Sequence, residues 1–223
     1  MAAIMNPELI IFDCDGVLID SEGVANTVIA QELTSLGWCM DAVTSMRLFM
    51  GMSLTDMEPI IETRLGHKLP SEWRAVLAQK LVVALGTESK LIPGADTILH
   101  DVTARGIDWR IASNSSNEEM AVKFARTGLT HITQGRTHSA ASVIARGGRA
   151  KPAPDVFLAA AASANTPPNR CIVLEDSALG VTAAVAAGMT CYGFAPHGTG
   201  ETLLAAGARK IFTRLDEILG VFA

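Results

Sequence analysis

Two aspartates one residue apart, Asp13 and Asp15, directly follow a short apolar run, Leu9 to Phe12. A run of this length, rich in β-branched and aromatic residues, predicts a buried strand. Alternate side chains of a strand point the same way, so both carboxylates are expected at its carboxyl end, where open α/β sheets bind ligands. Such a pair favours a cation between the carboxylates or a retained proton. A surface turn is the alternative interpretation, and the apolar run argues against it.

Three further polar groups follow predicted strands or precede a predicted helix. Glu175 and Asp176 come after the apolar run that begins at Cys171, and adjacent acids at the end of a buried strand are costly without a cation. Oxygen ligands suit Mg²⁺, so we expect Asp176 to bind this metal with Glu175 beside it. The alternative for this pair is a helix cap. Ser113 and Asn114 end another predicted strand, and Lys151 stands before a proline-initiated helix.

The pattern of apolar residues divides the chain into a helical block and an α/β part. Residues 21–88 contain predicted helices and no strand, with helices over 24–36, 41–49, 53–65 and 70–86. Beyond Pro93-Gly94, predicted strands at 109–112, 131–133, 171–174, 190–194 and 210–213 alternate with helices. Such alternation predicts a Rossmann-like α/β fold, a parallel sheet covered by helices on both faces. We therefore expect a core of residues 1–20 and 90–223 and an inserted all-helical cap of residues 21–89.

The segment from Asp13 to Ser21, Asp-Cys-Asp-Gly-Val-Leu-Ile-Asp-Ser, resembles the nucleophile motif of the haloacid dehalogenase superfamily. Ser113, the Lys-Pro-Ala-Pro-Asp sequence at Lys151 and the Glu-Asp-Ser-Ala-Leu-Gly sequence at Glu175 resemble the later motifs of that family, in order. Within the superfamily, the chain is similar to the β-phosphoglucomutase-like group of sugar-phosphate phosphatases. The resemblance extends over essentially the whole chain, and in this family the helical block closes over the active site.

The resemblance implies a two-step phosphoryl transfer. Asp13 would attack phosphorus and form an aspartyl-phosphate, while Asp15 would serve as general acid and then as general base. Ser113, Asn114 and Lys151 would bind the phosphoryl group, with Lys151 also offsetting the charge of Asp13. Mg²⁺ would be held by Asp13, Asp15 through its backbone carbonyl, and Asp176, with Glu175 as a further partner. A helix N-cap in the run from Ser113 to Ser116 and an ordinary surface lysine at Lys151 are the structural alternatives. The first can hold together with phosphate binding, with Ser116 as the cap.

The substrate-specificity loop of the family is matched by the segment from Arg47 to Ser53, which includes Gly51 and Met52. The alternative is a helix end followed by a turn. Arg47 could bind a carboxylate or a second phosphate. The expected substrate is a small phosphate monoester of a sugar, polyol or sugar acid.

Other activities remain open on sequence alone. Asp15 favours phosphate esters over the dehalogenase and phosphonate-hydrolase branches, whose members typically lack this second aspartate. A β-phosphoglucomutase-type mutase is the closest rival, although Ala25 and Leu54 stand where those mutases carry a histidine and an arginine. A non-catalytic sugar-phosphate-binding protein is a third possibility, against which the complete motif set argues.

Composition limits the remaining classes. The net charge of −5 and the lack of a basic run do not favour nucleic acid as a partner. The four cysteines form no CxxC pair, so a disulfide framework or zinc site is not expected. No apolar run is long enough for a membrane span, and the N-terminus lacks the basic start of a signal peptide. We expect a cytoplasmic monomer that acts on a small phosphorylated metabolite.

Overall fold

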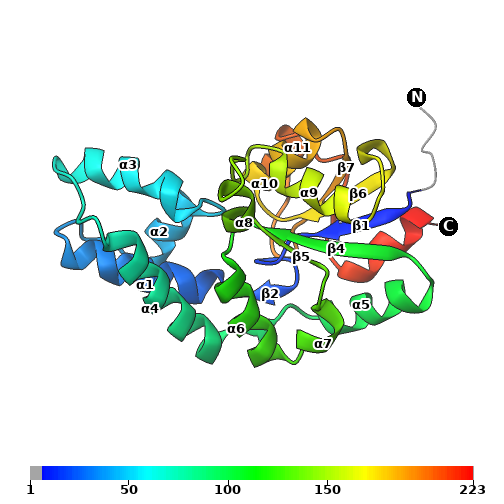
Figure 1. Ribbon diagram of the computed structural model, residues 1–223, viewed down its shortest axis with the longest axis horizontal. Helices are drawn as coiled ribbons and strands as arrows, with labels where there is room; N and C mark the ends of the chain where they lie inside the picture. Colours follow the sequence, from blue (N-terminus) through cyan, green and yellow to red (C-terminus); the bar gives the residue numbers. More distant parts are fainter. Residues whose placement is uncertain (1–6, 223) are drawn as a thin grey trace.

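The computed structural model describes residues 7–222 and is built around a six-stranded parallel sheet (Figure 1). The strand order is β5-β4-β1-β6-β7-β8, with all neighbouring strands parallel. The α/β fold expected from the alternation of elements is thereby confirmed. The strands are β1 (Leu9–Phe12), β4 (Asp108–Ser113), β5 (Thr137–Ser139), β6 (Cys171–Glu175), β7 (Thr190–Phe194) and β8 (Ile211–Phe212).

Helices cover both faces of the sheet, and β1 contributes to both cores. Ile10 and Phe12 pack with α5 (Ala95–Ala104), α6 (Asn117–Thr127) and the 3₁₀ helix η2 (Leu215–Phe222). Leu9 and Ile11 pack with α9 (Asp155–Ser163), α10 (Ala178–Ala186) and α11 (Glu201–Ala205). All four β1 side chains are fully buried, which explains why this strand is a continuous apolar run rather than an alternating one.

Four helices between β1 and the rest of the sheet form what we call the four-helix segment, residues 22–88. They are α1 (Glu22–Ser35), α2 (Ala42–Phe49), α3 (Leu54–Leu65) and α4 (Trp73–Glu88), and they share a hydrophobic cluster of their own. The segment extends to one side of the sheet (Figure 1). A short antiparallel ribbon, β2 (Ile19–Asp20) with β3 (Lys90–Leu91), lies where the chain enters and leaves it. The domain boundaries at 20/21 and 89/90 stay a prediction and fall at this ribbon.

Helix ends follow the capping residues that the sequence offers. Asp41 and Ser53 accept backbone hydrogen bonds at the starts of α2 and α3. Ser116 and Glu119 form a complete capping box at the start of α6. Gly37 follows the end of α1 with a φ of 96°, as expected for a glycine at that position.

One predicted strand is wrong. Residues 130–133 form a short helix, α7 (Thr130–Thr133), and the edge strand β5 lies further on, at Thr137–Ser139. Thr133 is buried, its hydroxyl bonds back to the Leu129 carbonyl and Ile132 packs against the core. The run is therefore helical despite the β-branched Ile132 and Thr133. The remaining short elements are α8 (Ala140–Ile144) and η1 (Pro168–Arg170). Over residues 7–222, no helix has both the length and the apolar character needed to cross a bilayer.

Candidate active site

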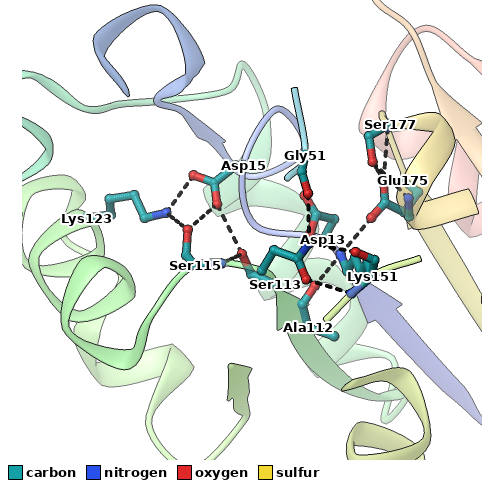
Figure 2. Close-up of polar contacts among 12 residues, drawn as sticks. Asp13, Asp15, Gly51, Ala112, Ser113, Ser115, Lys123, Lys151, Glu175 and Ser177 are labelled. Carbon is teal, nitrogen blue, oxygen red and sulfur yellow. Dashed lines mark hydrogen bonds and ion pairs between the residues drawn. The ribbon is translucent and has the colours of Figure 1, made fainter. Parts of the chain in front are cut away.

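The candidate site lies at the carboxyl ends of the three central strands. Strand order reverses at β1, which pairs with β4 on one side and β6 on the other, and ligands bind at such points in open α/β sheets. Asp13 follows β1, Ser113 ends β4 and Glu175 ends β6. Figure 2 shows these side chains converging from segments that are far apart in sequence.

Lys151 is the central cation of the site. Its Nζ donates to Asp13 Oδ1 at 2.5 Å, to Glu175 Oε1 at 2.7 Å and to the Ala112 carbonyl at 2.9 Å (Figure 2). Burial alone would lower the pKa of Lys151, but the two carboxylates raise it above its usual value, so the ammonium form is retained. The lysine is only 3% exposed and is not an ordinary surface residue. It is positioned to neutralise Asp13 and any anion beside it.

Three carboxylates, those of Asp13, Glu175 and Asp176, have oxygen atoms within 4.8 Å of one another. Burial raises the pKa of Asp13 to about 8, with Lys151 opposing the shift and Glu175 adding to it. Burial and the same acidic neighbours also raise the pKa of Asp176. A buried cluster that resists full ionisation, built from oxygen donors alone, fits a hard divalent cation such as Mg²⁺.

Glu175 has both oxygens engaged within the protein. Oε1 accepts from Lys151, and Oε2 accepts from the Ser177 backbone N–H and hydroxyl, each at 2.9 Å. Asp13 and Asp176 are therefore better placed than Glu175 to coordinate a cation directly. Glu175 orients the lysine that faces Asp13.

Two glycines in the motifs make room for these carboxylates. Gly16 has a φ of 76°, and a Cβ atom there would lie 1.8 Å from Asp176 Oδ2. A Cβ atom on Gly180 would lie 1.7 Å from Glu175 Oε1. The glycines that follow each acidic pair in sequence are thus required by close approach of the side chains themselves.

Asp15 has a different cationic partner from Asp13. Its Oδ1 accepts from Lys123 Nζ at 2.6 Å and from the Ser21 hydroxyl, and its Oδ2 accepts from Ser115 at 2.8 Å and Ser113 at 3.1 Å. Burial alone would raise the pKa of Asp15, but the Lys123 ammonium and these hydrogen bonds lower it to about 2. Both aspartates line one cleft, but they do not share the direction that strand spacing predicts. The strand ends at Phe12, and the Asp15 carboxylate is bonded to Lys123 while that of Asp13 is bonded to Lys151 (Figure 2).

Sequence reasoning missed Lys123, which is fully buried. The available signal was its position on α6 between Met120 and Phe124, which form the buried stripe of that helix. A lysine in an apolar stripe needs a partner for its charge. Here the partners are Asp15 and the Ser115 hydroxyl, which accepts from Lys123 Nζ at 2.8 Å.

Asn114 and Gly51 join the site to the four-helix segment. Asn114 Nδ2 donates to the Gly51 carbonyl at 2.7 Å and to the Lys151 carbonyl at 3.3 Å, and its Oδ1 accepts from the Lys151 N–H at 2.9 Å. This amide therefore binds backbone on both sides of the cleft. A direct role of Asn114 in substrate binding stays a prediction.

Of the other residues expected to contact substrate, three line the cleft and one does not. Gly51, Met52 and Ser53 line the cleft beside Asp13 and Asp15, which has a volume of about 140 Å³. Arg47 is exposed on α2 and lines neither this cleft nor the larger groove next to it. A contact between Arg47 and the substrate therefore stays a prediction.

Glu22, the first residue of α1, was also missed as a site residue. It lines both the cleft and the larger groove, and within residues 7–222 its carboxylate accepts no hydrogen bond and forms no ion pair. Burial raises the pKa of Glu22 to about 7, with the negative charges of Asp15, Glu175 and Asp20 adding to the shift. It is an acidic group directed at the cleft with its hydrogen-bonding capacity unused.

Comparison with known proteins gives consistent relatives. The model of the haloacid dehalogenase-like hydrolases matches residues 7–188. The 6-phosphogluconate phosphatase of Escherichia coli K12 is 26% identical over 193 residues, covering 85% of this chain and 84% of its own. Hexitol phosphatase A of the same organism is 29% identical over 203 residues, covering 86% and 84%. A haloacid dehalogenase-like protein of unknown function from Agrobacterium tumefaciens superimposes with a TM-score of 0.78 at 31% identity, covering 96% of both chains.

Proposed function

This chain belongs to the haloacid dehalogenase-like hydrolases, and from that premise we propose that it is a Mg²⁺-dependent phosphatase of small phosphate monoesters. The substrates would be phosphorylated sugars, polyols or sugar acids, and the reaction would pass through an aspartyl-phosphate. One observation carries the proposal: the Asp13 carboxylate is bonded to the Lys151 ammonium and has an oxygen within 4.8 Å of oxygens of Glu175 and Asp176, with Asp15 two residues further on. The names of the two bacterial relatives support the same class.

Each residue has a defined part in this reaction. A carboxylate oxygen of Asp13 attacks phosphorus, and the bond to the leaving oxygen breaks as the acyl phosphate forms. Lys151 and the Ser113 hydroxyl hold the phosphoryl oxygens. Asp15 gives a proton to the leaving alcohol and then takes one from the water that hydrolyses the intermediate.

Asp15 has to leave its resting position for this role. In the present arrangement Lys123 keeps it ionised, and an ionised carboxylate cannot protonate a leaving group. Asp15 must therefore turn from Lys123 towards the substrate and acquire a proton in the closed complex. The hydroxyls of Ser21 and Ser115 are the other contacts that this movement breaks.

Asp13, Asp176 and the backbone carbonyl of Asp15 are the groups that would hold Mg²⁺. When bound, the cation would neutralise charge on the transferred phosphoryl group and on the acidic cluster. Glu175 and Lys151 remain bonded to one another beside it. The expected cytoplasmic location and monomeric state remain predictions.

The cleft supports a phosphatase in preference to a mutase. Ala25 and Leu54 both line it, at the positions where the resemblance places a histidine and an arginine in mutases. Neither side chain can hold a second phosphate or exchange a proton. We therefore propose hydrolysis, with water as the acceptor of the phosphoryl group.

The test is release of inorganic phosphate from a panel of sugar, polyol and sugar-acid phosphates, with Mg²⁺ and with chelator. Asp13→Asn should abolish turnover while circular dichroism shows a folded protein. Release that needs Mg²⁺ and is lost in the variant supports the proposal. Activity retained by Asp13→Asn removes Asp13 as nucleophile. If no ester is hydrolysed, conversion of β-glucose 1-phosphate in the presence of its bisphosphate tests the mutase, and binding without turnover supports the non-catalytic alternative.

A further inference from the structure

The cleft beside Asp13 offers the alcohol part of a substrate an apolar wall. The side facing the four-helix segment is lined by Ile29, Phe49, Met52, Leu54, Met57 and Leu81. The polar side chains on this side are bonded elsewhere. Asn26 donates to the Glu22 carbonyl and accepts from Ser45, and Ser53 is bonded to Asp56. A leaving group would therefore meet few free polar partners there.

The residues that line the cleft are also predominantly negative in charge. Among its lining residues within 7–222, Lys151 is the single cation, and its ammonium is already shared by Asp13 and Glu175. Asp15 is balanced by Lys123, and Glu119 accepts the Ser116 N–H in the capping box of α6. Glu22 is the lining carboxylate left without a cation or a hydrogen bond.

The larger groove next to the cleft is also predominantly acidic. It has a volume of about 1290 Å³ and shares Glu22 with the cleft. Arg214 lines it but is paired with Asp216 at 3.0 Å, which leaves Lys90 as its other strong base within residues 7–222. Against these two stand six carboxylates, those of Asp20, Glu22, Asp101, Asp176, Glu201 and Asp216.

We propose that Glu22 is a specificity-determining residue: its carboxylate accepts a hydrogen bond from a hydroxyl of an uncharged polyol-type leaving group and disfavours esters that carry a second carboxylate or phosphate. The proposal rests on the phosphatase function proposed above. A hydrogen bond from a hydroxyl to an ionised carboxylate is stronger than one to a neutral acceptor. Two like charges a few ångströms apart repel strongly near a low-dielectric wall, and the cleft has no spare cation to offset that repulsion.

Matched substrates isolate this effect. Sorbitol 6-phosphate and 6-phosphogluconate share a carbon skeleton and differ at the end remote from phosphate, CH₂OH against carboxylate. Glycerol 3-phosphate and 3-phosphoglycerate form a shorter pair with the same difference. Values of kcat/KM would be measured with saturating Mg²⁺ at pH 8.5, above the pKa of Glu22. The wild-type enzyme should prefer the member of each pair that ends in CH₂OH by about ten-fold or more.

Glu22→Gln keeps the shape of the side chain and removes its charge. We expect the preference to fall about ten-fold, mainly because kcat/KM for the member that carries the carboxylate rises. Asp20→Asn is the matched control, since Asp20 is exposed, lines the groove and does not line the cleft. It removes one negative charge two residues away and should leave the preference unchanged. Calorimetry with Asp13→Asn as host measures binding of both members without turnover and should give the same ranking.

Three results would overturn the inference. The first is an unchanged preference in Glu22→Gln, and the second is an equal change in Asp20→Asn. The third is a parallel loss for both members together with a higher Mg²⁺ requirement, which would make Glu22 a metal-holding residue. Failure of the phosphatase proposal gives a distinct result, because the wild-type protein would then release no phosphate even from p-nitrophenyl phosphate, while the calorimetric ranking could still be measured.

Discussion

Asn114 is bonded to Gly51 across the cleft, with its Nδ2 2.7 Å from the Gly51 carbonyl oxygen. The same amide accepts the N–H of Lys151 at 2.9 Å. One side chain therefore links the four-helix segment to the loop that carries the central lysine. The position of Gly51 and the placement of the lysine backbone are linked through this residue.

Asn114→Ala should therefore weaken substrate binding. Loss of a net hydrogen bond is worth about 1 kcal/mol, which corresponds to a rise in KM of roughly five-fold. Steady-state kinetics on the best ester of the panel measures the effect. Asn117→Ala is the control, because Asn117 bonds Ser142 on the core side and does not line the cleft. Equal changes in the two variants would show that the link to Gly51 is unimportant.

Removal of Lys123 should destabilise the protein at neutral pH. Lys123→Met leaves the Asp15 carboxylate without its cation, and breaking a buried ion pair costs about 3 kcal/mol. We expect kcat to fall roughly 10- to 100-fold as well, because without Lys123 the Asp15 carboxylate has no fixed starting position beside the cleft from which to turn to the substrate. Urea unfolding and kinetics at pH 7 check both expectations.

The pH dependence of this loss has a definite sign. The pKa of Asp15 is lowered to about 2 in the folded protein, below its value of about 3.9 in an unfolded chain. The pair therefore stabilises the fold above pH 4, and that contribution disappears as pH falls through 2. The stability difference between wild type and Lys123→Met should shrink over this range. Lys123→Met combined with Asp15→Asn should recover stability at pH 7 but not activity, and failure to recover would contradict the pairing.

Stabilisation by Mg²⁺ should increase with pH. An unfolded chain releases the Asp13 proton near pH 4, whereas the folded protein without metal holds it to about pH 8. The free energy of unfolding of the metal-free protein therefore falls as pH rises between these values. Binding of Mg²⁺ needs the ionised carboxylate and opposes the fall.

Thermal unfolding at pH 6 and pH 8.5, with chelator and with Mg²⁺, measures this linkage. At one hundred times its Kd the cation contributes about 2.7 kcal/mol, or roughly 5 to 10 °C in Tm. The increase in Tm should be larger at pH 8.5 than at pH 6. Asp13→Asn should lose most of this pH dependence, and an equal increase at both pH values in the wild type would count against Asp13 as a metal ligand.

Much of the core and its central acids could be predicted because each signal was local. The apolar run of β1 requires burial on both faces. Asp13 and Asp176 directly follow their strands in sequence, and Glu175 is the last residue of β6. Likewise, Ser53 and Ser116 cap helices as their positions predict. These features depend on nearest neighbours and on strand or helix period.

The missed features depend on tertiary contacts. Lys123 is ten residues beyond Ser113. It belongs to the site only through its bond to Asp15, which lies 108 positions earlier in the chain. The ribbon of β2 and β3 is only two residues long on each side, so neither strand has a recognisable pattern. The run at residues 131–133 has strand-like residue types, but its packing after α6 selects a helix. Contacts of this kind leave no periodic trace in a single sequence.

Gly16→Ala should disrupt the acidic cluster itself. Gly16 has a φ of 76°, and a Cβ atom there would lie 1.8 Å from Asp176 Oδ2, so the Asp176 side chain must move. Gly66, the residue that follows the end of α3, has nearly the same φ of 77° and nothing within 4 Å of an added Cβ. Both substitutions carry the same backbone cost, about 1 to 2 kcal/mol for an alanine in the left-handed region. Only Gly16→Ala should also raise the Mg²⁺ concentration needed for half-maximal activity and lower kcat, by about 100-fold. If Gly66→Ala and Gly16→Ala lose stability equally and both keep full activity, Asp176 is not held in a catalytic position by the close approach of Gly16.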